Sequence, residues 1–538
     1  MSTNLDVLEP ILDVHDIQGN VLAGFNKDHQ TLLGLLLRNK EIAKQWIQSI
    51  SNRISALYEV HNFNVVFKTQ RKRLKKEPEE MKATWINIAF SYNGLKQLVE
   101  DTDTFDSDLD KRFKQGLYKR SSTLGDPTDK SSSGYADNWD IGEEKTGKHP
   151  VPDILLIIAS DSPDILKKEI DDIKKTMSNT DLQIVYDETG HDLSYYDFNK
   201  KGKEHFGFKD GISQPAIRGR MSSKTNDFLT SNRNDDGSVE NNDRKIEYTS
   251  NGRPLIAPGE FVLGYPTQNE NFPRIANPVP DSFPELLKNC SYLVFRKLRQ
   301  DVKGFEEFSK SESERLSSKE HFTDISPEKI KALFVGRWPS GSPLALSPNS
   351  DDETLASDSN KNNKFNYADD ENGYRTPYFS HIRKINPREI DTEEGSFTKT
   401  LTRRILRRGI PYGPLYDPLI LDDNNDRGLL FLSYQSSIES QFEFLMKEWA
   451  NTAVKPPSPP SPSGISGGHD LLIGQTNETN SLRVRYGNLV RKIDEQTVEE
   501  KITNEKSSIK DWVIPRGGGY FFVPSISMIK KIGKDCRN

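Results

Sequence analysis

Residues 207–211 read Gly-Phe-Lys-Asp-Gly, a segment in which a carboxylate stands between glycines. Glycine lets the backbone approach a planar ligand closely, because it has no side chain to clash with the ligand. A carboxylate in that position, Asp210, could accept a proton and return it. The same five residues also fit an ordinary Asp-Gly turn. By itself this segment therefore does not indicate a ligand site, and it must be considered together with the other segments.

A histidine and two arginines share residues 381–388, which read His-Ile-Arg-Lys-Ile-Asn-Pro-Arg. His381 offers a neutral imidazole nitrogen, a common axial ligand of haem iron. Arg383 and Arg388 could pair with the propionates of such a group, because guanidinium matches the geometry of a carboxylate. Pro387 would end a local helix and fix the position of Arg388. The alternative is a solvated basic turn that contains a structural histidine.

A third basic segment covers residues 403–413 and reads Arg-Arg-Ile-Leu-Arg-Arg-Gly-Ile-Pro-Tyr-Gly. A cation beside a peroxide site stabilises the anion that forms when the peroxide loses its proton, and Arg407 could supply it. The chain between His381 and Arg407 is long enough to bring the two to opposite faces of one ligand. The alternative is a basic helix end followed by a Gly/Pro turn.

The elements that must position these segments fall into two similar series. Apolar alternation and short apolar runs predict strands, and helical spacing predicts helices, in both halves of the chain. In the first half we expect strands at 62–68, 85–92, 153–159 and 182–186, and helices at 94–100 and 162–177. From about His205 onward we expect strands at 261–265, 291–298, 428–435 and 519–523, and helices at 301–310 and 438–449. The pattern predicts two α+β units with helices packed on sheets.

Three stretches are predicted to be insertions. Residues 222–252 and 347–373 are rich in Asn, Asp and Ser and lack apolar periodicity, which predicts exposed loops. Residues 455–468 read KPPSPPSPSGISGG, a Pro/Ser/Gly segment that is stiff first and flexible after. We interpret it as a long surface loop rather than a domain linker, because the strand expected at 519–523 must still join a sheet.

Length and composition limit the class of protein. The chain has 538 residues, which is too long for one ordinary core and favours two domains. Its net charge is -6, so no basic excess suggests a nucleic-acid partner. The chain contains no run of about 18 apolar residues, so no membrane-spanning helix is predicted.

The cysteines and the first residues narrow the setting. Cys290 and Cys536 are the two cysteines of the chain, and neither stands in a CxxC or CxxCH pattern. A cysteine zinc site and covalent haem attachment are therefore not expected. The first residues lack a basic start and an apolar core, so we expect no secretion signal and an intracellular protein. A secreted mature form, from which a signal has been removed, stays open.

Taken together and in this order, the three segments resemble the dye-decolorizing peroxidases, a family of haem peroxidases. Four further stretches also look like that family: 16–22 (Asp-Ile-Gln-Gly-Asn-Val-Leu), 336–341 (Gly-Arg-Trp-Pro-Ser-Gly), 427–434, and 517–522 (Gly-Gly-Gly-Tyr-Phe-Phe). The resemblance runs from about residue 16 to about residue 525. The length and the N-terminal stretch are most similar to the longer, fungal-type branch.

The resemblance implies a fold and a cofactor. The fold is two ferredoxin-like α+β domains, 1–204 and 205–538, each an antiparallel β-sheet with helices. One haem b per chain would be held mainly by the second domain. The matching position for the axial iron ligand is His381. Further residues match positions that contact the haem: Gly211, Ile212 and Ser213 on the side of Asp210, and Arg383, Asn386, Pro387 and Arg388 on the other.

The resemblance also implies a reaction, the reduction of hydrogen peroxide and the oxidation of dyes, phenols or other bulky one-electron donors. Asp210 would move a proton between the two peroxide oxygens, and Arg407 would stabilise the charge, with Arg408 in its place if the match is shifted by one residue. Tyr412 is the first candidate for a surface radical relay and Trp449 the second, with plain packing as the alternative for both. We interpret His205 as a turn histidine, and His149 and His469 as surface loop residues.

Two other functions remain as alternatives at this stage. A haem carrier, or a protein that removes iron from haem without peroxidase turnover, would use the same His381. Asp210 and Arg407 argue against it, because a carrier needs no proton shuttle opposite the ligand. A protein without haem, whose Asn/Asp/Ser loops bind a partner, is the second. The sequence predicts neither an oligomeric state nor the group that orients His381.

Overall fold

The computed structural model describes residues 5–99, 106–178, 180–224, 226–230, 240–241, 247–269, 276–318, 325–390, 392–420, 423–457, 467–475, 483–484, 500–501 and 511–534. Within these ranges, no helix is long and apolar enough to cross a membrane.

Eight strands form one antiparallel sheet that closes into a ring. The order is β11-β17-β2-β3-β1-β4-β13-β14, and β14 pairs again with β11. A short strand, β12, pairs with the same strand β14 as β13 does. Closure leaves few exposed strand edges. The bounds are β1 His29–Leu36, β2 Thr84–Phe90, β3 Ile154–Ser160, β4 Gln183–His191, β11 Ser291–Gln300, β12 Leu406–Arg407, β13 Ile410–Tyr412, β14 Gly428–Gln435 and β17 Val513–Val523.

Each half of the ring has the strand order of a ferredoxin-like unit. In the first half the order is β2-β3-β1-β4, so the first and third strands are central. In the second half the order is β17-β11-β14-β13, which again places the first and third strands of that half in the centre. The expected α+β fold with two ferredoxin-like antiparallel sheets is therefore confirmed. The domain boundary between 204 and 205 stays a prediction.

The halves join at two narrow seams. Phe522 of β17 lies opposite Phe90 of β2, and Tyr412 of β13 lies opposite Gly190 of β4. Glycine is required at position 190, because a Cβ there would lie 2.5 Å from Ile410 Cγ2 and 2.6 Å from the Pro411 carbonyl oxygen. The second seam therefore depends on a residue without a side chain.

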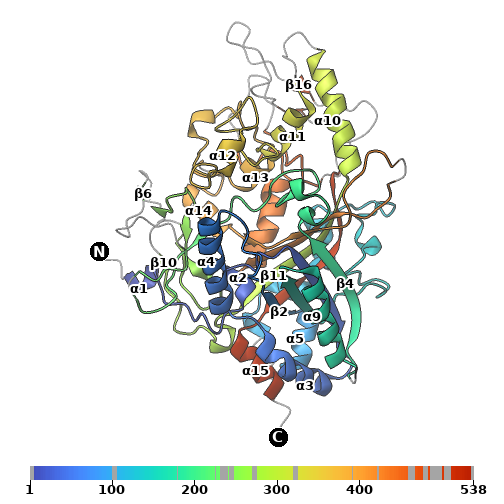
Figure 1. Ribbon diagram of the computed structural model, residues 1–538, viewed down its shortest axis with the longest axis vertical. Coiled ribbons are helices and arrows are strands. Elements are labelled where there is room, and N and C mark those ends of the chain that lie inside the picture. Colours follow the sequence, from blue (N-terminus) through green and yellow to red (C-terminus); the bar gives the residue numbers. More distant parts are fainter. Residues whose placement is uncertain are drawn as a thin grey trace.

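Side chains on the two faces of the strands enter different cores, as the period of two in a strand dictates. One core draws on all eight strands of the ring and fills its interior, and it includes Leu32, Leu155, Leu293 and Phe521. The other core packs the opposite face against helices. Those helices are α3 (Lys40–Ile50), α5 (Tyr92–Leu98), α9 (Pro163–Thr176) and α15 (Ile526–Lys534), which lie together at one end of the molecule in Figure 1.

The second half carries its own helical layer. It contains α10 (Val302–Ser317), α11 (Pro327–Val335), α12 (Glu353–Ser357) and α13 (His381–Ile385), at the opposite end of the molecule from α15 (Figure 1). A further helical segment, Ile438–Glu443 with Leu445–Ala450, is wound as a π-helix. Such widened turns occur frequently at functional sites.

Most predicted elements are present, but two predicted strands are wrong. Residues 62–68 lie inside α4 (Leu57–Leu74). That helix begins upstream, where the Glu59 carboxylate accepts the Ala56 N–H at 2.9 Å and where Leu57 and Val60 are buried. Residues 261–265 form turns after a short 3₁₀ helix, Pro258–Glu260, and Phe261, Val262 and Tyr265 reach the core of the ring interior from this irregular backbone.

The predicted loops are only partly exposed. Residues 347–373 are described throughout, and Asn363, Tyr367 and Asp370 among them are buried. Asn363 accepts hydrogen bonds from Arg337 and Arg388, which line the cavity described below, and the prediction of an exposed loop is wrong for these buried residues. Parts of 222–252 and residues 458–466 of the Pro/Ser/Gly segment lie outside the described residues. Strand β17 does join the main sheet beyond that segment.

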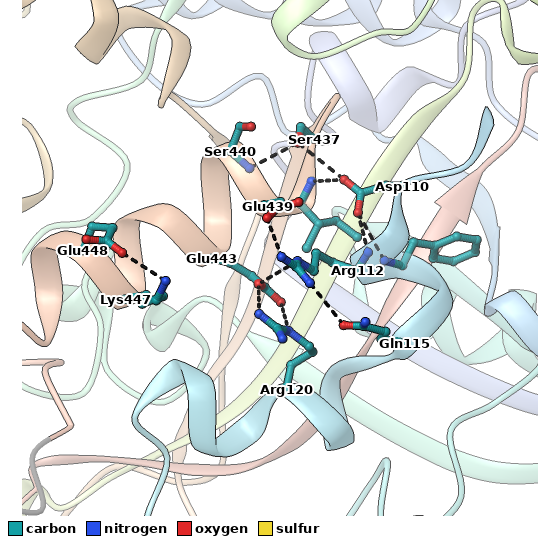
Figure 2. A network of polar contacts seen from close by, with 12 residues as sticks. Asp110, Arg112, Gln115, Arg120, Ser437, Glu439, Ser440, Glu443, Lys447 and Glu448 are labelled. Carbon is teal, nitrogen blue, oxygen red and sulfur yellow. Dashed lines mark hydrogen bonds and ion pairs between the residues drawn. The ribbon is translucent and has the colours of Figure 1, made fainter. Parts of the chain in front are cut away.

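A polar network ties the π-helix to two short helices of the first half, α7 (Lys111–Gln115) and α8 (Leu117–Arg120). Figure 2 shows Arg120 donating to both carboxylate oxygens of Glu443, at 3.0 and 2.8 Å. The Tyr520 hydroxyl donates to the same carboxylate at 2.9 Å. Asp110 accepts the Arg112 N–H with one oxygen and the Ile438 N–H with the other, so it caps both helices. The first half therefore holds the π-helix in place.

We expect Arg120→Ala to lower the free energy of unfolding by about 3 kcal/mol, because it leaves the buried Glu443 carboxylate without its bidentate partner. Urea denaturation measures this. Lys447→Ala on the π-helix is the control, since the Lys447 ammonium forms an exposed ion pair with Glu448. The control should change stability by no more than about 0.5 kcal/mol. Equal losses for the two variants would contradict a stabilising role of the Arg120 network.

Candidate functional site

A large cavity lies on the face of the second half-sheet that points away from the ring interior. Leu298 of β11 and Leu429 and Phe431 of β14 form one wall. Phe442 and Leu445 of the π-helix form another, and much of the lining is apolar. His381, Asp210 and Arg407 all line this same cavity. The structure therefore brings together three side chains that the sequence had placed in three separate segments.

His381 is the first residue of α13, and its imidazole is held from behind. The Nδ1 atom lies 2.8 Å from an oxygen of Asp470, whose side chain is fully buried. The other oxygen of Asp470 accepts the Leu472 and Ile473 N–H groups at 2.9 and 3.0 Å. Within the described residues, the contact with Asp470 is the only hydrogen bond of the His381 imidazole, so Nε2 is left for a ligand. A carboxylate behind a histidine fixes the ring and raises its basicity as a metal ligand.

The short helix α13 is fixed on both sides by its own basic residues. Arg383 donates to Asp370 and to the Thr376 carbonyl, at 3.1 and 2.8 Å. Lys384 donates to the carbonyls of Thr452 and Gly468, at 2.7 and 2.8 Å. Burial lowers the pKa of Lys384 to about 7. A five-residue helix has little stability of its own, so these contacts decide where His381 lies.

Asp210 and Arg407 form an ion pair in the cavity. Arg407 Nη1 donates to Asp210 Oδ1 at 2.9 Å, and the Gly211 N–H donates to the same oxygen at 2.6 Å. Gln214 accepts the Arg407 N–H and donates to its carbonyl, which fixes the backbone of Arg407. Positive φ angles at Gly207 and Gly211 allow the turn around Asp210.

Opposing influences set the charge of Asp210. Burial by itself would raise the pKa of the Asp210 carboxyl. The charge of Arg407, the Gly211 N–H and the facing His381 outweigh burial, and the pKa lies below its ordinary value of 3.8. Asp210 is therefore a carboxylate at neutral and mildly acidic pH, ready to accept a proton.

Three further arginines line the cavity without an anionic partner among the described residues: Arg337, Arg388 and Arg404. Burial, with the charges of Arg388 and Arg407, lowers the pKa of both Arg337 and Arg404 to about 9. Cations held together in this way provide a site for a ligand with carboxylate groups.

The backbone around these arginines is specialised. Arg388 has a φ of 57°, in the left-handed region. Asn363 Oδ1 accepts hydrogen bonds from both Arg388 and Arg337, at 2.8 and 3.2 Å. The guanidinium of Arg388 also stacks 3.7 Å from the centre of the Phe365 ring. Strain of this kind persists where the surroundings impose it, often at ligand sites.

The other predicted site residues divide into two groups. Gly211, Ile212, Ser213 and Asn386 line the cavity, and Pro387 is buried beside Arg388 without lining it. Arg383 does not reach the cavity, because Asp370 and the Thr376 carbonyl engage its guanidinium. The expected pairing of Arg383 with a haem propionate is therefore wrong, and its observed contacts fix α13 instead.

The predicted relay residues are not on the surface. Tyr412 is 2% exposed and Trp449 is 1% exposed, and neither lines the cavity. Tyr412 donates to Asp426 at 3.1 Å, and the Trp449 indole donates to Glu393 at 3.1 Å. The surface position expected for both is wrong, because Tyr412 packs in the core of the ring interior and Trp449 packs against Phe444. His469 is also buried rather than a surface loop residue.

Sequence reasoning missed Asp470, Asn363, Arg337 and Arg404. Asp470 lies 89 positions from its partner His381 and follows a Pro/Ser/Gly segment, so no local spacing connects the two. Arg337 stood in a stretch noted only for its likeness to the family. Arg404 lay three residues before Arg407, and the basic run could not show which of its members would face a ligand.

Comparison with known proteins gives two family matches. Residues 16–191 match the model of the DyP dimeric alpha+beta barrel domain, and residues 266–456 match that of the Dyp-type peroxidase C-terminal domain. The chain is 30% identical over 530 residues to the dye-decolorizing peroxidase msp1 of Mycetinis scorodonius, covering 97% of this chain and 88% of that protein. It is 30% identical to a dye-decolorizing peroxidase of Mycena epipterygia, covering 98% and 88%.

Solved structures give the same likeness over nearly the whole chain. An ancestral D-type dye decolorizing peroxidase superposes with a TM-score of 0.72 at 29% identity, covering 97% of this chain and 99% of that one. A variant of the dye-decolorizing peroxidase from Pleurotus ostreatus has a TM-score of 0.74 at 27% identity, covering 97% and 100%. A dye-decolorizing peroxidase in complex with 2,6-dimethoxyphenol has a TM-score of 0.71 at 26% identity, covering 97% and 100%.

We expect Asp470→Ala to weaken the binding of an iron porphyrin by about 10-fold to 100-fold, because His381 loses the carboxylate that orients it. Titration of the protein with haem, followed by absorption, measures the affinity. Glu393→Gln is the control, since Glu393 is a nearby carboxylate that bonds Trp449 and not His381. Unchanged affinity in Asp470→Ala would show that His381 does not depend on this carboxylate.

Proposed function

The chain belongs to the dye-decolorizing peroxidase family and is a haem-dependent peroxidase, and on that premise we propose the roles of its residues. The cavity would hold one haem b, whose iron would be bound by the imidazole of His381. Asp210 and Arg407 act on hydrogen peroxide from the opposite wall. The observation that carries this proposal is the meeting of a carboxylate-backed histidine and an Asp–Arg pair in one cavity.

The residues present fit haem in their chemistry. The imidazole of His381 presents Nε2 and has its other nitrogen occupied, as an iron ligand requires. Arg337, Arg388 and Arg404 supply the positive charge that two propionates need, and their own ion partners are absent from the described residues. The apolar walls from Leu298, Phe431 and Leu445 suit a porphyrin face.

When bound, the haem would supply the redox chemistry by which hydrogen peroxide is reduced. The protein supplies the proton chemistry. Asp210, ionised because Arg407 holds its pKa low, accepts a proton from one oxygen of hydrogen peroxide and returns it to the other. Arg407 stabilises the negative charge that develops as the O–O bond breaks. Gln214 keeps Arg407 in the required place.

The haem carrier, considered above as an alternative, is not favoured. Its site would need His381 and the arginines but would gain nothing from a charged Asp–Arg pair opposite the ligand. The organic donors proposed for this chain are dyes and phenols, by analogy with the relative that binds 2,6-dimethoxyphenol.

We expect Asp210→Asn to lower kcat/KM for hydrogen peroxide by about 10²-fold to 10⁴-fold, since the amide cannot take the proton. Stopped-flow measurement of peroxide reduction gives the rate. Haem content and affinity should match the wild type, because Asp210 does not hold the cofactor in this proposal. A variant that retains the wild-type rate with full haem content would remove Asp210 from the mechanism.

The pH dependence of the reaction tests Arg407. The acid limb that belongs to Asp210 should lie below the ordinary carboxyl pKa of 3.8, because the pKa of Asp210 is depressed. Arg407→Leu removes the main charge that depresses it, so the acid limb should move to higher pH and the rate should fall at every pH.

Arg408→Leu is the matched comparison for Arg407→Leu. The Arg408 guanidinium donates to the carbonyls of Asn20, Val21, Leu22 and Arg407, and not to Asp210. This variant should lose stability and keep the acid limb in place. An acid limb that moves in Arg408→Leu and stays in place in Arg407→Leu would contradict the role proposed for Arg407.

A further inference from the structure

A second carboxyl side chain, Glu204, lines the same cavity as Asp210 and has no role in the chemistry above. It lies in the turn that carries Asp210. The Asp210 N–H donates to the Gly202 carbonyl at 3.1 Å, and the Glu204 N–H donates to the Phe208 carbonyl at 3.0 Å. The turn is thus closed by backbone hydrogen bonds on either side of the Glu204 side chain.

The carboxylate of Glu204 holds this turn from within. One oxygen accepts the Phe206 N–H and the other accepts the Phe208 N–H, both at 2.9 Å. Gln300, the last residue of β11, donates its side-chain amide to the oxygen that binds Phe206. Glu204 therefore connects the rigid central strand of the second half to the turn on which Asp210 stands.

The partner Gln300 suits two protonation states of Glu204. Its Oε1 atom is buried and has no hydrogen-bond partner in the described part of the chain. A half-turn of the amide would present this oxygen to Glu204, which could then donate a proton to it once protonated. The pair keeps one mutual hydrogen bond in either state. The protonated carboxyl, however, is a weaker acceptor for the N–H groups of the turn, since charge-assisted hydrogen bonds are the stronger ones.

We propose that Glu204 is a positioning residue for peroxide activation, and that its protonation, accommodated by Gln300, loosens the turn that carries Asp210. This proposal rests on the role of Asp210 given above.

Burial and the surrounding charges place the protonation of Glu204 near neutral pH. Burial raises the pKa of Glu204 to about 7, against the hydrogen bonds from Gln300, Phe206 and Phe208, and the negative charge of Asp210 raises it further. His205 beside it is neutral there, because burial lowers the pKa of that imidazole to about 4. Arg296 and Asp126, which also line the cavity, form an ion pair with each other at 2.9 Å.

The sign of the effect follows from these directions. Below about pH 7 Glu204 is protonated, and the turn is held by weaker hydrogen bonds. Above that pH the carboxylate binds both N–H groups firmly, and Asp210 is fixed opposite His381. The peroxide step should therefore become faster as the pH rises through about 7.

The first measurement is kcat/KM for hydrogen peroxide against pH in the haem-loaded protein. In the wild type we expect a rise of about threefold to tenfold centred near pH 7, since small misplacements of a catalytic group are costly. Glu204→Gln should lack this rise and keep the acid limb that belongs to Asp210. Gln300→Met removes a hydrogen-bond donor that lowers the pKa of Glu204, so the rise of kcat/KM in this variant should move to higher pH.

The second measurement does not depend on activity. Infrared difference spectra should show a protonated carboxyl band that the wild type loses as the pH passes about 7 and that Glu204→Gln lacks. Asp172→Asn, a change at an exposed carboxylate paired with Lys175, is the control and should retain both the band and the rise.

The outcomes separate the positioning role from the proposed function. A rise that persists in Glu204→Gln, or a wild type with activity but no titrating band, would overturn the positioning role alone. A wild type without peroxide activity would overturn the proposed function, and the positioning role with it, even if the band titrates.

Discussion

The hydrogen bond between His381 and Asp470 is the interaction on which the rest of the site depends. Asp470 is fully buried, and its second oxygen accepts two backbone N–H groups, so its position is fixed independently of the histidine. The imidazole can then turn only one nitrogen toward the cavity. Arg383 and Lys384 hold the same short helix from two sides, which leaves little freedom at His381.

The cavity separates its charges by position. Arg337, Arg388 and Arg404 line the cavity and have no anionic partner among the described residues, whereas Asp210 in the same cavity is compensated by Arg407. A cluster of like charges is unfavourable in a buried place unless an anion joins it. The strained backbone at Arg388 and the shared acceptor Asn363 keep two of those cations in position. We read this arrangement as preparation for a ligand that completes the charge balance.

The first half of the chain supports the site without lining most of it. Its short helices α7 and α8 hold the π-helix through Asp110, Arg120 and Glu443 (Figure 2). The π-helix in turn supplies cavity walls and, through the Ala450 carbonyl, an acceptor for the Asp470 N–H. A closed ring of strands makes this coupling stiff, because neither half can shift without breaking the seams at Phe90 and Gly190.

The amino-acid sequence by itself determined the chemical groups and most of the elements. The α+β class, the helix at Pro163–Thr176, the long strands and the trio His381, Asp210 and Arg407 followed from local patterns and from likeness to a family. These features depend on periodicity and on neighbours in the chain, which a sequence displays directly. The prediction of a strand at 62–68 is wrong because these residues belong to a longer helix. That helix is anchored by the buried side chains of Leu57 and Val60 near its start.

Only the tertiary structure decided which side chains act together. Asp470 behind His381, Asn363 between two arginines, and Gln300 against Glu204 each join residues far apart in the chain. Arg383 and Arg388 stand five residues apart with the same charge, yet one fixes a helix and the other faces the cavity. A sequence shows that a cation is present, but its direction depends on the packing of the whole fold around it.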